Sequence, residues 1–262
     1  MTSYFRKGSG EPVVLVHGIG SRWELWEPVI DRLAEERDVI AVDLPGFGLT
    51  PADPTVVPGA VGYAEWLAGF LEELDIERPH VVGNSMGGGI AIEAGRQGIA
   101  GRVTAFSPIG FWGRPGRMWT QGLLTSVRAL ATHAGPVVDR LSSVKHTRSA
   151  SLALLFGQPG NVSQEEAARH IDGLVSAVSF PAARDSFSTY HLEVGDDFGK
   201  LGDIPVTIAW GTRDLTLIHR TQSAKARRVL PDARHLDLPR CGHLPYSDDP
   251  DLCARVILED PA

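Results

Sequence analysis

Hydrophobic positions follow two different patterns along this chain. Short apolar runs, rich in β-branched residues and typical of buried parallel strands, occupy residues 12–16, 38–43, 79–83, 102–106, 205–210 and 234–238. Segments between them carry apolar residues three and four positions apart, which predicts amphipathic helices over residues 24–36, 61–75, 219–230 and 249–258. Strands that alternate with helices predict a mostly parallel sheet with crossover helices on its faces.

The alternation stops between about Phe111 and Gly195. This stretch shows no convincing strand, and its apolar spacing predicts helices over residues 119–132, 136–144, 149–156, 163–178 and 181–192. Glycine and proline residues gather at its ends, which is typical of a boundary between structural units. We therefore expect a core domain of residues 1–110 and 196–262 that is interrupted by an all-helical insertion of residues 111–195.

Residues 83–87 read Gly-Asn-Ser-Met-Gly and lie between a predicted strand and a small-residue helix pattern. This G-x-S-x-G sequence in that context predicts a sharp turn that lifts a serine hydroxyl above the sheet. Gly83 and Gly87 lie where two backbone segments come close together, and glycine has no side chain that would clash there. Ser85 would then lie at a helix N-terminus, where the dipole favours negative charge. Ser85 is the candidate nucleophile.

A serine nucleophile needs a base and an orienting carboxylate, which follow it in the chain order Ser, Asp, His. His243 lies in a glycine-containing loop just past the strand over 234–238, and Asp214 lies on the loop that follows the strand over 205–210. Both loops leave the same edge of a parallel sheet, so these two residues are the candidate base and acid. Other histidines lie on helix-like segments without a partner motif, and we expect them to be solvated or packed: His133, His146, His170, His191 and His219.

Attack on a carbonyl creates an oxyanion that needs two hydrogen-bond donors. One candidate is the backbone N–H of Met86, directly after the nucleophile. The other is the backbone N–H of Ile19, because His17-Gly18-Ile19-Gly20 follows the early strand over 12–16 and its glycines let the amide point inward. We expect His17 to hold this loop by hydrogen bonds and to take no part in the chemistry.

Five motifs now stand in order along the chain, namely His17-Gly18-Ile19-Gly20, Asp43-Leu44-Pro45-Gly46-Phe47-Gly48, Gly83-Asn84-Ser85-Met86-Gly87-Gly88, Trp210-Gly211-Thr212-Arg213-Asp214 and Gly242-His243. In this order and spacing the chain resembles the α/β-hydrolase family over nearly its whole length. The resemblance implies that Ser85, Asp214 and His243 are the nucleophile, acid and base. It also implies that Ile19 and Met86 are the oxyanion donors.

The resemblance further implies the α/β-hydrolase fold, with helices on both faces of the sheet. We expect about seven strands where the family usually has eight, because only an edge strand over Tyr4-Phe5-Arg6 fits before the strand at 12–16. The helical insertion would be the family's cap domain, which shapes an apolar pocket over the nucleophile. The substrate-binding candidates are Trp112, Met118, Trp119 and Leu244, and further lining candidates are Phe111, Leu123, Leu124, Leu154, Leu155 and Phe156.

Composition narrows the function classes. The 262 residues, 43% of them hydrophobic, suit one large domain with an insertion, and the net charge of −7 argues against a nucleic-acid partner. No apolar run reaches the roughly 20 residues of a membrane helix, and the first residues lack a signal peptide, so we expect a cytoplasmic enzyme without a membrane partner. Arginine outnumbers lysine, which suggests a GC-rich bacterial genome. Cys241 and Cys253 form neither a disulfide framework nor a metal-binding spacing.

The residues predict two-step acyl transfer through a covalent intermediate on Ser85, without a metal or cofactor. The first hypothesis is a carboxylesterase or lactonase on small to medium, apolar esters. The second is a C–C bond hydrolase of ring-fission products of aromatic degradation. Those enzymes often share the sequence of residues 83–88, but they tend to carry Trp where this chain has Leu244, and Arg169 and Arg184 are the possible cap arginines. The third is a weakly catalytic, ligand-binding member of the fold. The sequence carries no signal for oligomeric state.

Overall fold

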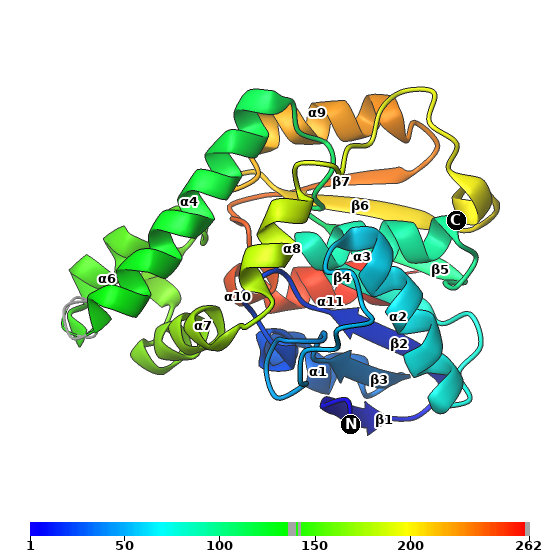
Figure 1. The fold of residues 1–262 in the computed structure, drawn as a ribbon, viewed down its shortest axis with the longest axis horizontal. Helices are drawn as coiled ribbons and strands as arrows, with labels where there is room; N and C mark the ends of the chain where they lie inside the picture. The colour runs from blue at the N-terminus through cyan, green and yellow to red at the C-terminus, as the bar shows by residue number, and fades with distance from the viewer. Residues whose placement is uncertain (136–139, 141–142, 260–262) are drawn as a thin grey trace.

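One seven-stranded sheet runs through the protein in a computed structural model that describes residues 1–135, 140 and 143–259. The strands are β1 Tyr4–Gly8, β2 Glu11–Val16, β3 Arg37–Val42, β4 His80–Asn84, β5 Arg102–Phe106, β6 Val206–Gly211 and β7 Arg234–Leu238. Their order is β1-β3-β2-β4-β5-β6-β7 (Figure 1). Only β1 is antiparallel to its neighbour, and every other pair is parallel. The predicted mostly parallel sheet, its strand positions and its edge strand are confirmed.

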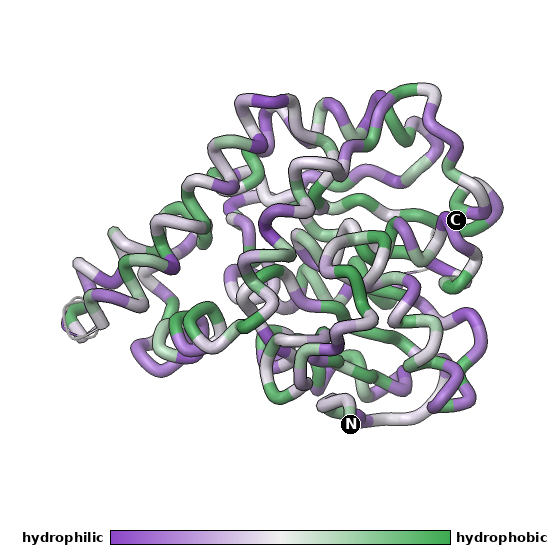
Figure 2. Tube along the Cα trace, in the orientation of Figure 1, coloured by the Kyte–Doolittle hydropathy of each residue, from purple (hydrophilic) through white to green (hydrophobic). Residues whose placement is uncertain are grey.

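The sheet is buried on both faces because its strands carry apolar side chains at successive positions. In β2, Val14 and Val16 belong to one hydrophobic cluster, while Val13 and Leu15 belong to the cluster on the opposite face. Successive residues of a strand point to opposite faces, so a continuous apolar run needs a helical layer on each side. Figure 2 shows these strands as a mostly hydrophobic centre within a more hydrophilic outer chain.

Two helical layers provide that cover. The first layer packs on the cluster that contains Val14 and consists of α2 Ala60–Glu73, α3 Met86–Arg96 and α9 His219–Val229. The second packs on the cluster that contains Val13 and consists of α1 Glu27–Leu33 and α11 Pro250–Leu258 (Figure 1). The helix expected over 24–36 is divided into a 3-10 turn, η1 Trp23–Trp26, and α1, whose first turn contains Pro28. Two short elements, η3 Gly199–Asp203 and α10 Pro245–Asp248, were not predicted.

The described part of the region between β5 and β6 contains helices and no strand, as the sequence predicted. Its elements are α4 Arg114–His133, α6 Lys145–Leu152, η2 Pro159–Asn161, α7 Gln164–Ser176 and α8 Phe180–Ser186. Figure 1 shows α4, α6 and α7 extending beyond one end of the sheet. The helical pattern predicted over 136–144 lies mostly outside the described residues. The division of the chain at residues 111 and 195 stays a prediction.

The boundaries of the insertion's helices differ from the sequence patterns where tertiary contacts intervene. The pattern over 181–192 predicted one helix, but α8 ends at Ser186. Beyond it, Phe187, Tyr190 and Leu192 are buried in the core cluster, and the Leu192 N–H donates to the Gly110 carbonyl at 3.0 Å. This segment therefore returns to the core through a turn and an irregular connection. Within the described part of the chain, the helices lack the combination of length and apolarity that crossing a membrane requires.

The helix that follows β4 lies unusually close to the ends of its neighbouring strands. A Cβ atom on Gly87 would lie 2.1 Å from the Val16 carbonyl oxygen, and one on Gly83 would lie 1.9 Å from the Gly87 carbonyl oxygen. Both contacts are with backbone atoms, which cannot move aside without shifting a strand. The approach of α3 to β2 and β4 therefore requires glycine at both positions.

Gly87→Ala and Gly69→Ala form a matched pair, since both residues lie within helices but only Gly87 is enclosed. We expect Gly87→Ala to lower the free energy of unfolding by about 1–3 kcal/mol through overpacking. Gly69 is exposed with nothing within 4 Å of a new Cβ, so Gly69→Ala should raise it by up to about 1 kcal/mol. Urea unfolding followed by circular dichroism measures both, and equal effects at the two positions would contradict the packing argument.

Candidate active site

Ser85 occupies a strained turn between β4 and α3. Its φ of 58° and ψ of −115° lie in a region that a residue with a side chain rarely adopts. The turn is held by three backbone hydrogen bonds: the Ser85 N–H donates to the Phe106 carbonyl at 3.0 Å, and the Ser85 carbonyl accepts from Gly89 and Ile109, each at 3.1 Å. The predicted sharp turn after the strand is therefore present, and it presents the Ser85 side chain to a cavity at the edge of the sheet.

A buried hydrogen bond joins His243 to Asp214. The loops after β6 and β7 bring the two side chains together, with His243 Nδ1 2.8 Å from Asp214 Oδ2. The other carboxylate oxygen, Oδ1, accepts from the Thr216 and Leu217 N–H groups, each at 2.9 Å. An ionised carboxylate only accepts, so Nδ1 carries the proton and Nε2 keeps a free lone pair. This is the tautomer that a general base requires.

Ser85 and His243 line the same cavity of about 210 Å³. Among the described residues, no hydrogen bond engages the Ser85 hydroxyl, so Ser85 and His243 share this space without a direct bond. Catalytic hydrogen bonds of this kind are often long before substrate binds. The sequence-predicted residues Ser85, Asp214 and His243 thus lie at one edge of the sheet, although they come from three separate loops.

The loop after β2 lies against the nucleophile. A Cβ atom on Gly18 would lie 3.2 Å from the Ser85 Cβ, and Ile19 lines the cavity. His17 is fully buried: its Nδ1 lies 2.7 Å from the Gly18 carbonyl, and its Nε2 accepts from the Leu44 N–H at 3.1 Å. Burial lowers the pKa of His17, which favours the neutral ring that can hold both partners. His17 is therefore placed to hold the loop, as its motif predicted.

Met86 is the first residue of α3 and directly follows Ser85. The first N–H groups of a helix have no partner within the helix, so they remain available to a negative charge nearby. Ile19 and Met86 therefore approach Ser85 from the loop after β2 and from the start of α3.

The cavity wall is aliphatic. Its apolar side chains come mainly from α4, α6, α7 and the segment after α6: Leu123, Leu124, Val127, Leu130, Ala131, Leu152, Leu154, Leu155, Ile171 and Leu174. Leu244, directly after His243, also lines it. No Asp, Glu, Lys or Arg is among the lining residues of the described chain, where His170 and His243 are the titratable groups. A charged substrate group would therefore meet no compensating charge on this wall.

Three of the expected substrate-binding residues lie elsewhere. Trp112 is fully buried and its Nε1 donates to the Tyr190 carbonyl at 3.0 Å, which fixes it in the core. Met118 and Trp119 are 58% and 44% exposed and do not line the cavity, and the Trp119 Nε1 donates to the Leu215 carbonyl at 2.8 Å. The physical reason is the geometry of α4: Met118 lies on the face opposite Val127, and Trp119 lies about three turns before Leu130, nearer the start of the helix. Phe111 and Phe156 are likewise buried in the core clusters.

Asn84 is a positioning residue that the motif did not single out. Its side-chain amide donates to the His243 carbonyl at 3.0 Å and to the Phe106 carbonyl at 3.1 Å. Its Oδ1 accepts from the Tyr246 hydroxyl at 3.1 Å. Asn84 therefore ties the turn that carries Ser85 to the loop that carries His243. A buried polar residue inside G-x-S-x-G was the available signal, but its partners lie far away in the sequence.

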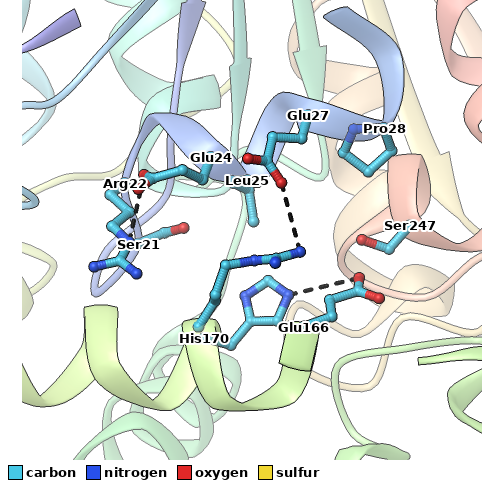
Figure 3. Close-up of a pocket in the computed structure, with 10 residues that line it drawn as sticks. Ser21, Arg22, Glu24, Leu25, Glu27, Pro28, Glu166, His170 and Ser247 are labelled. Atoms are coloured by element: carbon cyan, nitrogen blue, oxygen red, sulfur yellow. Dashed lines mark ion pairs between the residues drawn. The ribbon is translucent and has the colours of Figure 1, made fainter. Parts of the chain in front are cut away.

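A second, smaller cavity of about 100 Å³ adjoins the first and is polar (Figure 3). The two cavities share Ser21, Leu25 and His170. The smaller cavity is lined by ion-paired groups, with Arg169 3.5 Å from Glu27 and His170 3.9 Å from Glu166. His170 was expected to be a solvated or packed residue, and the structure places it between the two cavities.

The thiol of Cys241 is buried two residues before His243. Burial, together with the nearby Asp248 and Asp249 carboxylates, raises the pKa of Cys241 to about 12, so it remains a thiol at neutral pH. Across the described residues, no group of three or more His, Cys, Asp or Glu side chains is arranged to hold a metal ion.

Comparisons with known proteins agree with this geometry. A family model described as "Alpha/beta hydrolase family" matches residues 13–256. An uncharacterised protein of Mycobacterium tuberculosis (strain ATCC 25618 / H37Rv) is 28% identical over 260 residues, covering 93% of this chain and 73% of that protein. The 2-hydroxy-6-oxo-2,4-heptadienoate hydrolase of Pseudomonas putida is 41% identical over 88 residues, which is 32% of either protein. A thermophilic esterase from Thermogutta terrifontis has a similar structure, with a TM-score of 0.68 at 20% identity, covering 98% of this chain and 91% of the esterase.

Tyr246→Phe tests the link through Asn84. The substitution removes the hydroxyl donor and leaves the buried Asn84 Oδ1 without its partner, so we expect the free energy of unfolding to fall by about 1–3 kcal/mol. Urea unfolding measures the change. Tyr4→Phe is the control, since Tyr4 is exposed at the edge strand and should change stability little. A Tyr246→Phe protein as stable as wild type would mean that this hydrogen bond contributes nothing.

Proposed function

We propose a serine-hydrolase function for this chain, which belongs to the alpha/beta hydrolase family. Ser85 is the nucleophile, His243 the general base and Asp214 the carboxylate that orients the base. One observation carries the proposal: Ser85 and His243 line one cavity while Asp214 holds His243 Nδ1 at 2.8 Å. The strained turn at Ser85 supports it, because such strain persists where exposing a side chain is useful.

Acylation begins when His243 Nε2 accepts the proton of the Ser85 hydroxyl. The Ser85 oxygen attacks the carbonyl carbon of the substrate, and the electron pair of the C=O bond moves to its oxygen. The tetrahedral intermediate collapses, the bond to the leaving group breaks, and the imidazolium of His243 gives its proton to the departing oxygen. Water then transfers a proton to His243 and attacks the acyl carbon. The bond between that carbon and the Ser85 oxygen breaks, and His243 returns the proton to the Ser85 oxygen as the carboxylic acid is released.

The backbone N–H groups of Ile19 and Met86 form the oxyanion hole in this proposal. The loop after β2 abuts Ser85 through Gly18, and Met86 begins the helix that follows it. Each donor aimed at a developing oxyanion contributes about 3 kcal/mol to transition-state stabilisation. The same donors would serve both the formation and the breakdown of the acyl-enzyme.

The substrate class is an uncharged, aliphatic ester or lactone of small to medium size. The supporting observation is the aliphatic wall of the cavity, which includes no Asp, Glu, Lys or Arg among its described residues. Burying an unpaired carboxylate against such a wall would be costly. We also propose that residues 111–195 form a cap over the core of residues 1–110 and 196–262, since α4, α6 and α7 supply most of this wall.

A second candidate function is hydrolysis of a C–C bond in a ring-fission product. It is favoured by the 41% identity over 88 residues to a 2-hydroxy-6-oxo-2,4-heptadienoate hydrolase. Against it, the dienoate carboxylate would find no cation on the described cavity wall. Arg169, a possible cap arginine, lines the smaller cavity, where it faces Glu27, and does not line this wall.

Substitution of the proposed triad should abolish turnover while leaving the fold intact. We expect Ser85→Ala and His243→Ala each to lower kcat on p-nitrophenyl butyrate by about 10⁴-fold, with a somewhat smaller loss for Asp214→Asn. The measurement is a panel of p-nitrophenyl esters together with one dienoate ring-fission product. Selective turnover of the dienoate would favour the second function. No turnover of either, with no labelling of Ser85 by a fluorophosphonate, would leave a ligand-binding protein.

Leu124→Ala and Met118→Ala test which face of α4 contacts the acyl chain. Leu124 lines the cavity and Met118 is exposed away from it. We expect Leu124→Ala to lower kcat/KM for p-nitrophenyl hexanoate by about 10-fold, since lost apolar contact of this size is worth 1–3 kcal/mol. It should alter kcat/KM for the acetate ester much less, and Met118→Ala should leave both unchanged. Equal losses from the two variants would refute the orientation of α4.

A further inference from the structure

We propose that Asp248 is a positioning residue that clamps the loop carrying His243 to the cap segment that lines the substrate cavity. This inference rests on the proposed role of His243 as the base. Asp248 is the last residue of the short helix α10, is buried, and makes no contact with the substrate cavity. Its importance would come from the two backbone segments that it joins.

Three backbone N–H groups converge on the Asp248 carboxylate. Oδ2 accepts from Gly242 at 2.7 Å and from Gly157 at 2.8 Å, and Oδ1 accepts from Gln158 at 2.7 Å. The Gln158 side-chain amide also donates to the Asp248 carbonyl at 3.0 Å. Gly242 directly precedes His243, whereas Gly157 and Gln158 follow α6. One carboxylate thus joins the loop that carries His243 to a segment that begins about 90 positions before Asp248 in the chain.

The two segments are in direct backbone contact. A Cβ atom on Gly242 would lie 2.4 Å from the Gly157 nitrogen, and one on Gly157 would lie 2.1 Å from the Arg240 carbonyl oxygen. The Leu155 carbonyl accepts from the His243 N–H at 2.6 Å and from the Leu244 N–H at 3.2 Å. Neither segment can shift without moving the other, and the carboxylate supplies the acceptors that this crowded junction would otherwise lack.

An ionised carboxylate satisfies all three donors. It offers two oxygens that accept and no hydrogen that would oppose an N–H group. An asparagine at this position would turn an NH₂ group toward one of the donors, which would leave that buried N–H unpaired. The donor pattern therefore explains a buried acidic residue that the acyl-transfer steps themselves do not use.

The same carboxylate would hold in place both the loop of the base, His243, and the segment that forms part of the cavity wall. Gly242 fixes the start of the loop that aims His243, and Gly157 fixes the end of the segment that contributes Leu154 and Leu155 to the cavity. Displacing a catalytic group by about 1 Å can cost about 10²-fold in rate. Loosening the clamp should therefore affect turnover, although Asp248 lies outside the reacting groups.

Asp248→Asn tests the proposal, with Asp249→Asn as the matched control. Both substitutions remove one negative charge from neighbouring positions. Asp249 caps α11 through the Leu252 N–H at 3.0 Å, a role that asparagine also fills. The measurements are urea unfolding, kcat and KM on p-nitrophenyl butyrate, and hydrogen–deuterium exchange in peptides that cover residues 153–160 and 240–245.

We expect Asp248→Asn to speed exchange in both peptides together and to lower kcat by about 10²-fold in protein that remains folded. Asp249→Asn should leave exchange in both peptides and kcat unchanged. Asp248→Glu, which keeps the carboxylate, should recover part of kcat, which a purely structural defect would not predict.

Two results would overturn the proposal: unchanged exchange in either peptide, or faster exchange with an unchanged kcat. A loss of kcat that matches the unfolded fraction would also overturn it. Failure of the proposed function is distinguishable, because wild-type protein would then be inactive on every ester while the exchange measurements would still report on the clamp.

Discussion

The hydrogen bond between Asp214 and His243 is the interaction on which the proposed chemistry depends. Both side chains are buried, so the 2.8 Å contact works in surroundings where electrostatic interactions are strong. The Thr216 and Leu217 N–H groups hold the far oxygen of the carboxylate, which fixes its orientation. The bond then decides which imidazole nitrogen faces the cavity. Without it, the Ser85 turn would present a hydroxyl with no base of defined tautomer.

The loops around this pair are held by polar side chains that bond to backbone groups. Asn84 holds the His243 carbonyl from the side of β4, and Asp248 holds the Gly242 N–H from the side of α10. Buried polar groups are favourable where every donor and acceptor has a partner, because an unpaired one loses its hydration without compensation. The site is thus surrounded by satisfied networks, and these limit the freedom of loops that would otherwise be mobile.

Above these loops the residues that line the cavity change from polar to aliphatic. The cavity wall from α4, α6 and α7 is aliphatic, and the ion-paired groups of Arg169, Glu27 and Glu166 are confined to the smaller cavity behind His170. Polar chemistry at the floor and an apolar wall above it suit a reaction in which a small charged centre develops within a hydrophobic substrate. The separation also keeps paired charges away from the acyl site.

Local sequence alone determined the strands, the Ser85 turn and the loops that carry Asp214 and His243, because each depends on neighbouring residues: apolar runs, glycines at crowded positions and strand ends. Two features were decided only by the tertiary structure. The placement of α4 put Leu123 and Leu124 against the cavity and left Met118 and Trp119 outside it, since helical periodicity identifies an apolar face without saying what it covers. The partners of Asn84 and Asp248 lie up to 162 positions away, and no local pattern encodes which distant groups a buried polar side chain will meet.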